Sequence, residues 1–138
     1  MWVYPLKTLL PKPETVNEIA TLGSGKIPSN VLQAKALKLE NNYIRVVKPQ
    51  FVYHEIEQGT DAFYRCSLDF LNNLIDSNLI ESKSEAFYLY RQQHHSGVDI
   101  CGWILGVDIN DYFNGKIKKH ENIIKAKEDR LIKHVKVL

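Results

Sequence analysis

The sequence contains few cysteines and no cysteine motif for metal binding. Cys66 and Cys101 are the only two among its 138 residues, and they lie far apart, without a Cys-x-x-Cys pair or the ligand spacing of a zinc site. Two such isolated thiols exclude the dense disulfide framework that holds many small secreted domains together. We therefore expect two reduced, partly buried cysteines in a cytoplasmic protein.

Long apolar runs and a strong excess of charge are missing as well. No stretch approaches the roughly 20 apolar residues that span a bilayer, and the start, MWVYPLKTLL, lacks the basic and apolar regions of a signal peptide. The formal net charge is only +2, which argues against strong nucleic-acid binding, because such proteins usually carry dense basic patches. We expect neither a membrane segment nor a strong interaction with nucleic acid.

The composition is typical of a folded domain. Hydrophobic residues make up 44% of the chain and charged residues 25%, which provides material for a core and does not indicate disorder. The sequence has no internal repeat and no low-complexity segment. From the length we expect a single domain over residues 1–138.

The longest periodic segment predicts a helix from Thr60 or Asp61 to about Asn78. Its apolar residues follow the i, i+4, i+7, i+11 spacing of one buried stripe, formed by Tyr64, Leu68, Leu71 and Ile75. Two shorter helices are expected before it, over Glu14–Leu22 and Val31–Glu40. Pro13 and Ser29 are suited to begin them.

Alternating and β-branched segments predict the strands. The hairpin is expected to pair Phe87–Gln93 with Val98–Ile109, with Gly97 in its turn. A further strand is expected over Tyr43–Val47, and the lead Trp2–Leu10 should be extended. The sequence therefore predicts an α+β fold, with an antiparallel β-hairpin and at least one further strand covered by three to four helices.

Three local motifs have simple structural explanations. The GSGK segment at Gly23–Lys26 lacks the spacing and the preceding strand of a phosphate-binding loop. The adjacent His94 and His95 lie in the hairpin turn, without a nearby cluster of metal ligands. Tyr88, Tyr90 and Gln92 share one strand face, which could stack a base, but cross-strand packing explains them equally well.

The stretch GKIKKHENIIKAKEDRLIKH, Gly115–His134, has the most specific pattern. We expect a helix over about Asn122–Lys136 whose core-facing stripe is Ile124, Leu131, Val135 and Leu138. Lys127, Arg130 and His134 form a second stripe at the border of that apolar face.

Glu121 and His120 lie just before this stripe of cations. At a helix start, the helix dipole stabilises a carboxylate by about 0.3–1 kcal/mol, and free N–H groups there can bind an anion. The region could therefore combine a carboxylate base, an imidazole and phosphate-binding cations. The simpler alternative is a solvated charged face, supported by the i, i+4 pair Asp129 and Lys133.

Three motifs also resemble a known family. They are YLYRQ at Tyr88–Gln92, GKIKKHENI at Gly115–Ile123 and KEDRLIKH at Lys127–His134. The chain is similar along nearly its whole length to the uncharacterised bacterial family catalogued as domain of unknown function 1015. The lead YPLKTLLPKPE and the segment YIRVVKP are part of the resemblance.

The chain departs from this family in ways that affect the expected function. A family Tyr and Asp are missing from the segment Ile27–Val31, and isoleucine replaces a threonine at Ile123 or Ile124. Family members are considerably longer and continue into a D-G-H-H-R motif that is absent here. The resemblance therefore implies an N-terminal fragment of a longer protein.

The family is distantly similar to free serine kinases of the ParB/sulfiredoxin-like fold, whose K-P-H-E motif resembles Lys118–Glu121. This resemblance implies the N-terminal portion of a nucleotide-dependent phosphotransferase that acts on a small hydroxyl compound and is inactive alone. Glu121 would be the base and His120 would orient or neutralise, while Lys127, Arg130 and His134 would hold phosphate. The full-length protein would use ATP or ADP with Mg²⁺, held mainly by the nucleotide and water.

The sequence also fits two non-catalytic functions. The chain could be a nucleotide-responsive regulatory or protein-interaction module, or a structural domain whose charged helix only keeps it in solution. Nucleotide binding would distinguish the regulatory module from the structural domain. Phosphoryl transfer would distinguish the kinase from both.

Overall fold

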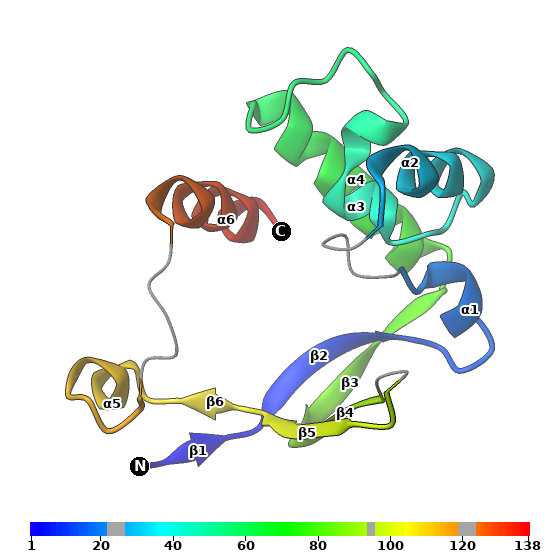
Figure 1. The fold of residues 1–138 in the computed structure, drawn as a ribbon. Coiled ribbons are helices and arrows are strands. Elements are labelled where there is room, and N and C mark those ends of the chain that lie inside the picture. The colour runs from blue at the N-terminus through cyan, green and yellow to red at the C-terminus, as the bar shows by residue number, and fades with distance from the viewer. Residues whose placement is uncertain (22–26, 94–95, 119–123) are drawn as a thin grey trace. The chain divides into compact units, whose positions relative to one another are not determined.

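The structure is a computed structural model, and it describes residues 1–21, 27–93, 96–118 and 124–138. Two compact units account for these residues: unit 1 comprises residues 1–10 and 82–122, and unit 2 comprises residues 11–81 and 123–138. The elements confirm the predicted α+β class, although the described residues contain six α-helices rather than three to four (Figure 1). None of the described helices is long and apolar enough to cross a membrane.

Unit 1 is built mainly from short strand pairs. Strands β4 (Tyr88–Gln93) and β5 (Asp99–Ile104) form the antiparallel hairpin, with Tyr88 opposite Ile104 and Gln93 opposite Asp99. This confirms the predicted hairpin, and Gly97 adopts the positive φ of 80° expected of its turn.

The extended N-terminal lead also forms strands. Strand β1 (Val3–Tyr4) pairs with β6 (Gly106–Val107), and β2 (Leu6–Pro11) pairs with β3 (Ile80–Ala86). Strand β3 was not predicted, because its sequence IESKSEA is mostly polar. The unit is completed by the short helix α5 (Ile109–Phe113), which Asp108 caps by accepting a hydrogen bond from the Asn110 N–H at 2.8 Å.

Unit 2 is helical, and its core lies around α4 (Asp61–Asp76). The helix begins as predicted, because the Thr60 hydroxyl accepts a hydrogen bond from the Phe63 N–H at 3.3 Å. Its buried residues are Phe63, Tyr64, Ser67 and Leu74. The expected stripe is therefore shifted, since Tyr64 is buried but Ile75 is exposed.

Smaller helices pack around α4. These are α1 (Val16–Ile19), α2 (Ser29–Lys38), α3 (Ile44–Val47) and the 3₁₀-helix η1 (Pro49–Phe51). Two apolar clusters hold them together: Ile19, Val46, Leu74 and Ile80 form one, and Leu32, Ala36 and Ile44 form the other. The helix α1 is shorter than predicted, and α2 begins at Ser29 itself.

The strand predicted over Tyr43–Val47 is wrong, because this segment forms the helix α3. The buried Asn42 explains the difference. Its side chain accepts a hydrogen bond from the Ile44 N–H at 3.2 Å and donates to the carbonyls of Glu18 and Ala20 at 2.8 and 2.9 Å. The first bond engages the Ile44 N–H at the start of α3, and the other two hold Asn42 against the end of α1. Together they favour a helical turn over the β propensity of Ile44, Val46 and Val47.

Candidate functional site

The last helix, α6 (Lys125–Val137), carries the three cationic or imidazole side chains that the sequence singled out. It begins at Lys125, after an extended Ile124, and therefore three residues later than predicted. The two predicted catalytic residues, Glu121 and His120, lie outside the described residues. The described part of the site thus consists of α6 and the elements that it contacts.

A pocket of about 240 Å³ lies between α4 and α6, and we call it the α4–α6 pocket. It contains residues from the end of α3, the loop before α4, α4 and α6. Its lining residues are Val47, Lys48, Gln58, Phe63, Tyr64, Arg130, Leu131 and His134. Arg130 and His134, which are one helical turn apart, are thus brought together as the sequence predicted.

Contacts from two buried aromatic residues fix α6 on α4. The Tyr64 hydroxyl donates a hydrogen bond to the Arg130 carbonyl at 3.3 Å. The His134 ring lies against both Phe63 and Tyr64, with ring centroids 6.3 and 5.8 Å apart. These contacts place the turn from Arg130 to His134 at the pocket.

His134 has an unusual environment for an imidazole. Its Nε2 atom is buried and has no hydrogen-bond partner among the described residues, and burial lowers the pKa of the ring below its ordinary value of 6.5. His134 is therefore neutral at pH 7. It serves first as an aromatic contact between α6 and α4, and it would have to gain a partner before it could carry charge.

Arg130 is exposed, and its guanidinium is only partly engaged. The Nε–H donates to the Ala126 carbonyl at 3.2 Å, within the same helix. Within the described ranges, no carboxylate forms an ion pair with Arg130 or with Lys48. The pocket therefore has two cationic side chains without a described neutralising partner.

Lys48 was not predicted as a site residue. It follows α3 and precedes Pro49, about 80 positions before Arg130 in the sequence. Nothing local marks it as a partner of the last helix, and only a prediction of how α3, α4 and α6 pack could have found it.

Lys127 does not line the α4–α6 pocket. It is exposed on α6, so the structure brings together only two of the three predicted phosphate contacts. The charged surface of the helix is organised by Lys125, whose Nζ lies 3.2 Å from Glu128 and 2.9 Å from Asp129. The pair expected between Asp129 and Lys133 is replaced by the pair between Lys125 and Asp129.

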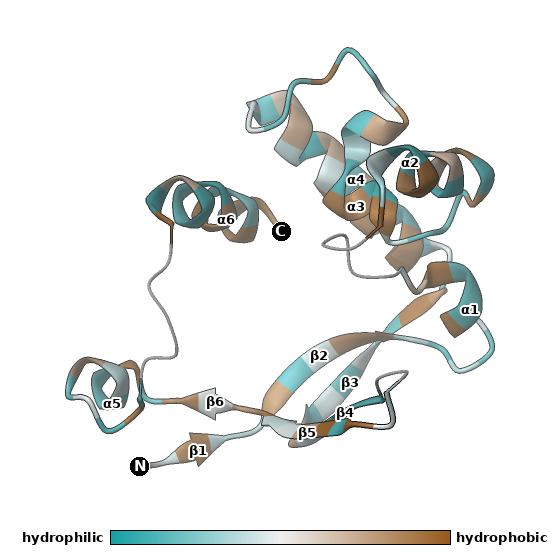
Figure 2. Ribbon diagram, viewed as in Figure 1, coloured by the Kyte–Doolittle hydropathy of each residue, from teal (hydrophilic) through white to brown (hydrophobic). Residues whose placement is uncertain are grey.

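The apolar stripe predicted to face the core is exposed, so this prediction is wrong. Leu131 and Val135 are 63% and 68% exposed, and Ile124 and Leu138 are exposed as well. The reason is that His134 and the Arg130 carbonyl make the ring contacts and the hydrogen bond with α4, and of the four aliphatic residues only Leu131 lines the α4–α6 pocket. Figure 2 shows apolar and polar residues interspersed along α6.

The other motifs of the sequence do not form a second catalytic cluster in the described chain. GSGK at positions 23–26 and the pair His94–His95 lie outside the described residues. Tyr90 donates to the Gln92 side chain at 3.0 Å, and the Tyr88 hydroxyl accepts a hydrogen bond from Thr8 at 2.7 Å. Among the described residues, no group of three or more His, Cys, Asp or Glu side chains could hold a metal ion.

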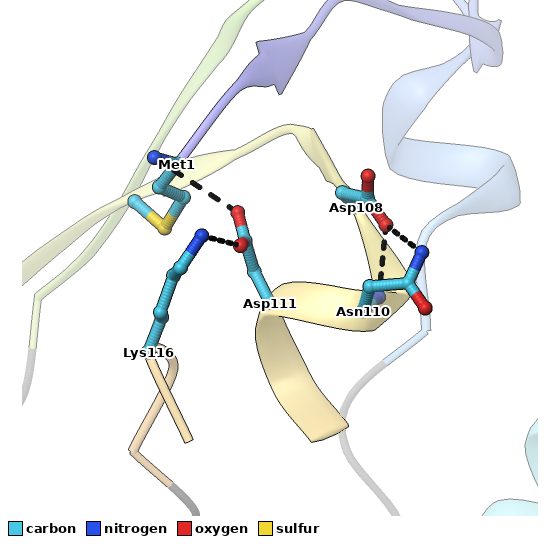
Figure 3. Close-up of polar contacts among 5 residues, drawn as sticks. All are labelled: Met1, Asp108, Asn110, Asp111 and Lys116. Carbon is cyan, nitrogen blue, oxygen red and sulfur yellow. Dashed lines mark hydrogen bonds and ion pairs between the residues drawn. The ribbon is translucent and has the colours of Figure 1, made fainter. Parts of the chain in front are cut away.

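A polar cluster around the buried Asp111 in unit 1 was not predicted from the sequence. The Asp111 carboxylate lies 2.7 Å from the Lys116 ammonium and 4.0 Å from the amino group of Met1 (Figure 3). The hydrogen bond from Lys116 holds the pKa of the Asp111 carboxyl below its usual value. This cluster fixes the turn that leads toward residues 119–123, so we assign it a structural role.

The comparison with family models agrees with the resemblance seen in the sequence. Residues 3–138 match the model of the family described as a protein of unknown function, DUF1015. This chain belongs to the DUF1015 family. No curated protein and no solved structure matches this DUF1015 chain.

Proposed function

We propose that this DUF1015 chain is the N-terminal portion of a nucleotide-dependent phosphotransferase that acts on a small hydroxyl compound. In this proposal, the α4–α6 pocket binds phosphate groups of the nucleotide. The observation that carries it is the pairing of Lys48 and Arg130 at one pocket. No carboxylate is among the residues that line this pocket in the described chain.

The charges at the pocket favour a ligand with several negative oxygens. An arginine guanidinium forms paired, charge-assisted hydrogen bonds with phosphate, and a lysine adds a compact positive charge. Two cations without described ion-pair partners raise the local positive potential, and the apolar walls from Val47, Phe63 and Leu131 limit its screening. Gln58 adds an uncharged amide for hydrogen bonding.

The size of the pocket fits the phosphates better than a whole nucleotide. Its volume of about 240 Å³ is below the roughly 300–1,000 Å³ of typical small-molecule sites. The base and ribose would therefore contact other parts of the full-length protein. This agrees with the expectation that the chain is inactive alone.

The roles proposed for Glu121 and His120 are based on the family resemblance. Glu121 would accept the proton of the attacking hydroxyl, and His120 would orient that carboxylate or balance its charge. Because the described lining of the pocket contains no carboxylate, Mg²⁺ would be held by the phosphates and water, as is common for this ion. Lys127 would contact phosphate only from outside the α4–α6 pocket.

Calorimetric titration with ATP and ADP tests the binding part of this proposal. We expect Arg130→Gln and Lys48→Gln each to weaken binding about 10- to 100-fold, the loss expected for one charge-assisted hydrogen bond. Lys133→Gln is the matched control, since Lys133 is an exposed cation of α6 that does not line the pocket. Equal affinities for the three variants would contradict the phosphate site.

Turnover by the full-length protein tests the catalytic part. Glu121→Gln should abolish phosphoryl transfer and leave nucleotide affinity nearly unchanged. If the unsubstituted full-length protein binds nucleotide but transfers no phosphate, the nucleotide-responsive regulatory module replaces the kinase. That alternative is favoured by one observation, which is that the described lining has cations but no acid or base carboxylate.

A further inference from the structure

A second pocket of unit 2 has the chemistry of a ligand site and has no role in the proposed function. Its volume is about 180 Å³, and it lies where the turn after α2 meets α3 and α4. We call it the Arg45 pocket. Its polar lining residues are Glu40, Asn41, Asn42, Arg45 and Asn73.

Arg45 is held in a fixed orientation at this pocket. Its Nε–H donates to the Ala36 carbonyl at 2.7 Å, and its Cζ lies 5.7 Å from the centre of the Phe70 ring. The side chain is half-buried, and the structure shows no ion pair between Arg45 and a described carboxylate. A guanidinium that is positioned, partly desolvated and unneutralised is well suited to bind a carboxylate.

Two of the other polar residues of the pocket are held by hydrogen bonds within the described chain, and two are available to a ligand. Asn42 is fully engaged, because its side chain makes three hydrogen bonds with backbone groups. Asn41 donates to the Glu18 carboxylate. No hydrogen bond of the described chain engages the Glu40 carboxylate or the Asn73 amide, and both residues are exposed at the pocket.

The pocket therefore offers a guanidinium, a carboxylate and an amide around a small volume with apolar walls. Phe70, Val46 and Leu74 supply these walls. A small zwitterion satisfies all three polar groups, since its carboxylate can bind Arg45, its ammonium can bind Glu40 and a polar substituent can bind Asn73. A simple anion would leave Glu40 as a repelling neighbour.

We propose that the Arg45 pocket binds a small zwitterion of the amino-acid class. This site does not depend on the proposed phosphotransferase activity, because the described linings of the Arg45 pocket and the α4–α6 pocket share no residue. The ligand would bind through Arg45 and Glu40, which are five positions apart on either side of the fixed Asn42.

The test is a titration of the ¹⁵N-labelled chain with single L-amino acids, followed by amide chemical shifts. We expect at least one amino acid to shift the amides of Arg45 and Asn73. The amine-free and carboxylate-free analogues of that amino acid should bind roughly tenfold more weakly or worse, because each lacks one charge-assisted contact. Equally strong binding of either analogue would contradict a zwitterion site.

Two substitutions on α4 give a matched comparison. Asn73→Asp places a negative charge at the pocket and should weaken binding about tenfold or more, whereas Asn72→Asp adds the same charge to an exposed neighbour that does not line it. Glu40→Gln should weaken binding of the amino acid but not of its amine-free analogue. The absence of shifts with every amino acid, or equal effects of the two aspartate variants, would overturn the proposal.

Discussion

Helices α4 and α6 lie against each other but are stabilised in different ways. Helix α4 has 16 residues, a side-chain cap at Thr60 and four buried residues. Helix α6 has 13 residues, no side-chain cap and no buried residue. Thus α4 belongs to the core of unit 2, whereas α6 is attached to it through a few contacts around His134 and Arg130.

Amphipathic spacing alone therefore does not identify the residues of a core. Both helices have an apolar stripe in the sequence, but only α4 buries most of its apolar face in the described structure. The residues of α6 that matter for the site are instead those at the border of its stripe. A loosely attached helix is suited to a binding site, because ligand contacts can contribute a large share of its stability.

The largest expected effect is in the core around α4. Leu74 is only 4% exposed, so Leu74→Ala should lower the free energy of unfolding by about 2–5 kcal/mol through lost burial and a new cavity. The matched variant on α6, Val135→Ala, should change it by less than about 0.5 kcal/mol, since Val135 is exposed. Urea denaturation measures both, and similar values would contradict the contrast between the two helices.

The N-terminal cap of α4 gives the next effect. Thr60→Ala should cost about 1 kcal/mol of stability, because the Phe63 N–H loses its side-chain acceptor. Thr60→Ser keeps the hydroxyl and should stay close to the unsubstituted chain. If the two variants unfold at the same denaturant concentration, the hydroxyl does not cap α4.

A smaller effect is expected where α6 attaches to α4. Tyr64→Phe removes the hydroxyl that donates to the Arg130 carbonyl, a hydrogen bond worth about 0.5–1.5 kcal/mol. We expect amide hydrogen exchange to become faster in α6 and to stay nearly unchanged in the interior of α4. Faster exchange throughout both helices would show that α6 does not open separately.

The smallest effect is a pH dependence of the same attachment. Burial lowers the pKa of His134 in the folded chain below its ordinary 6.5, so the unfolded or detached state binds a proton more readily. Attachment is therefore unaffected above pH 6.5 and weakens as the pH falls from 6.5 toward the lowered pKa. The opening of α6, obtained from amide exchange relative to the intrinsic exchange rate at each pH, should increase over that range and should not do so in His134→Phe. An unchanged pH dependence of opening in that variant would exclude His134 as the cause.

Much of the fold could be predicted because local signals agreed with the tertiary structure. Helix α4 and the β4–β5 hairpin each have a clear period and a suitable terminal residue, Thr60 and Gly97. The strand prediction over Tyr43–Val47 was wrong because the β-branched residues of this segment favour a strand, whereas the hydrogen bonds of Asn42 with Ile44, Glu18 and Ala20 favour the helix.

The site was predictable only where it depends on spacing within one helix. Arg130 and His134 are four positions apart, so their common side of α6 follows from helix geometry. Lys48 could not be found in this way, because it reaches the pocket only through the packing of α3, α4 and α6. The burial of Asp111 does not follow from helix spacing either, since its partners are Lys116, after the end of α5, and the amino group of Met1. Lys127 has the helical spacing expected of a neighbour of Arg130 and His134, but it does not line the pocket. The way α6 packs on α4 determines which residues beside its apolar stripe face the pocket.

The binding of phosphate groups at the α4–α6 pocket can be tested by mapping ADP with amide chemical shifts on the ¹⁵N-labelled chain. We predict that the largest shifts fall on the described residues of the α4–α6 pocket, at Lys48, Arg130 and His134, and that Arg130→Gln reduces them while Lys133→Gln does not. Absence of shifts at these residues under saturating ADP, or shifts that persist unchanged in Arg130→Gln, would contradict the assignment of this pocket as a phosphate site.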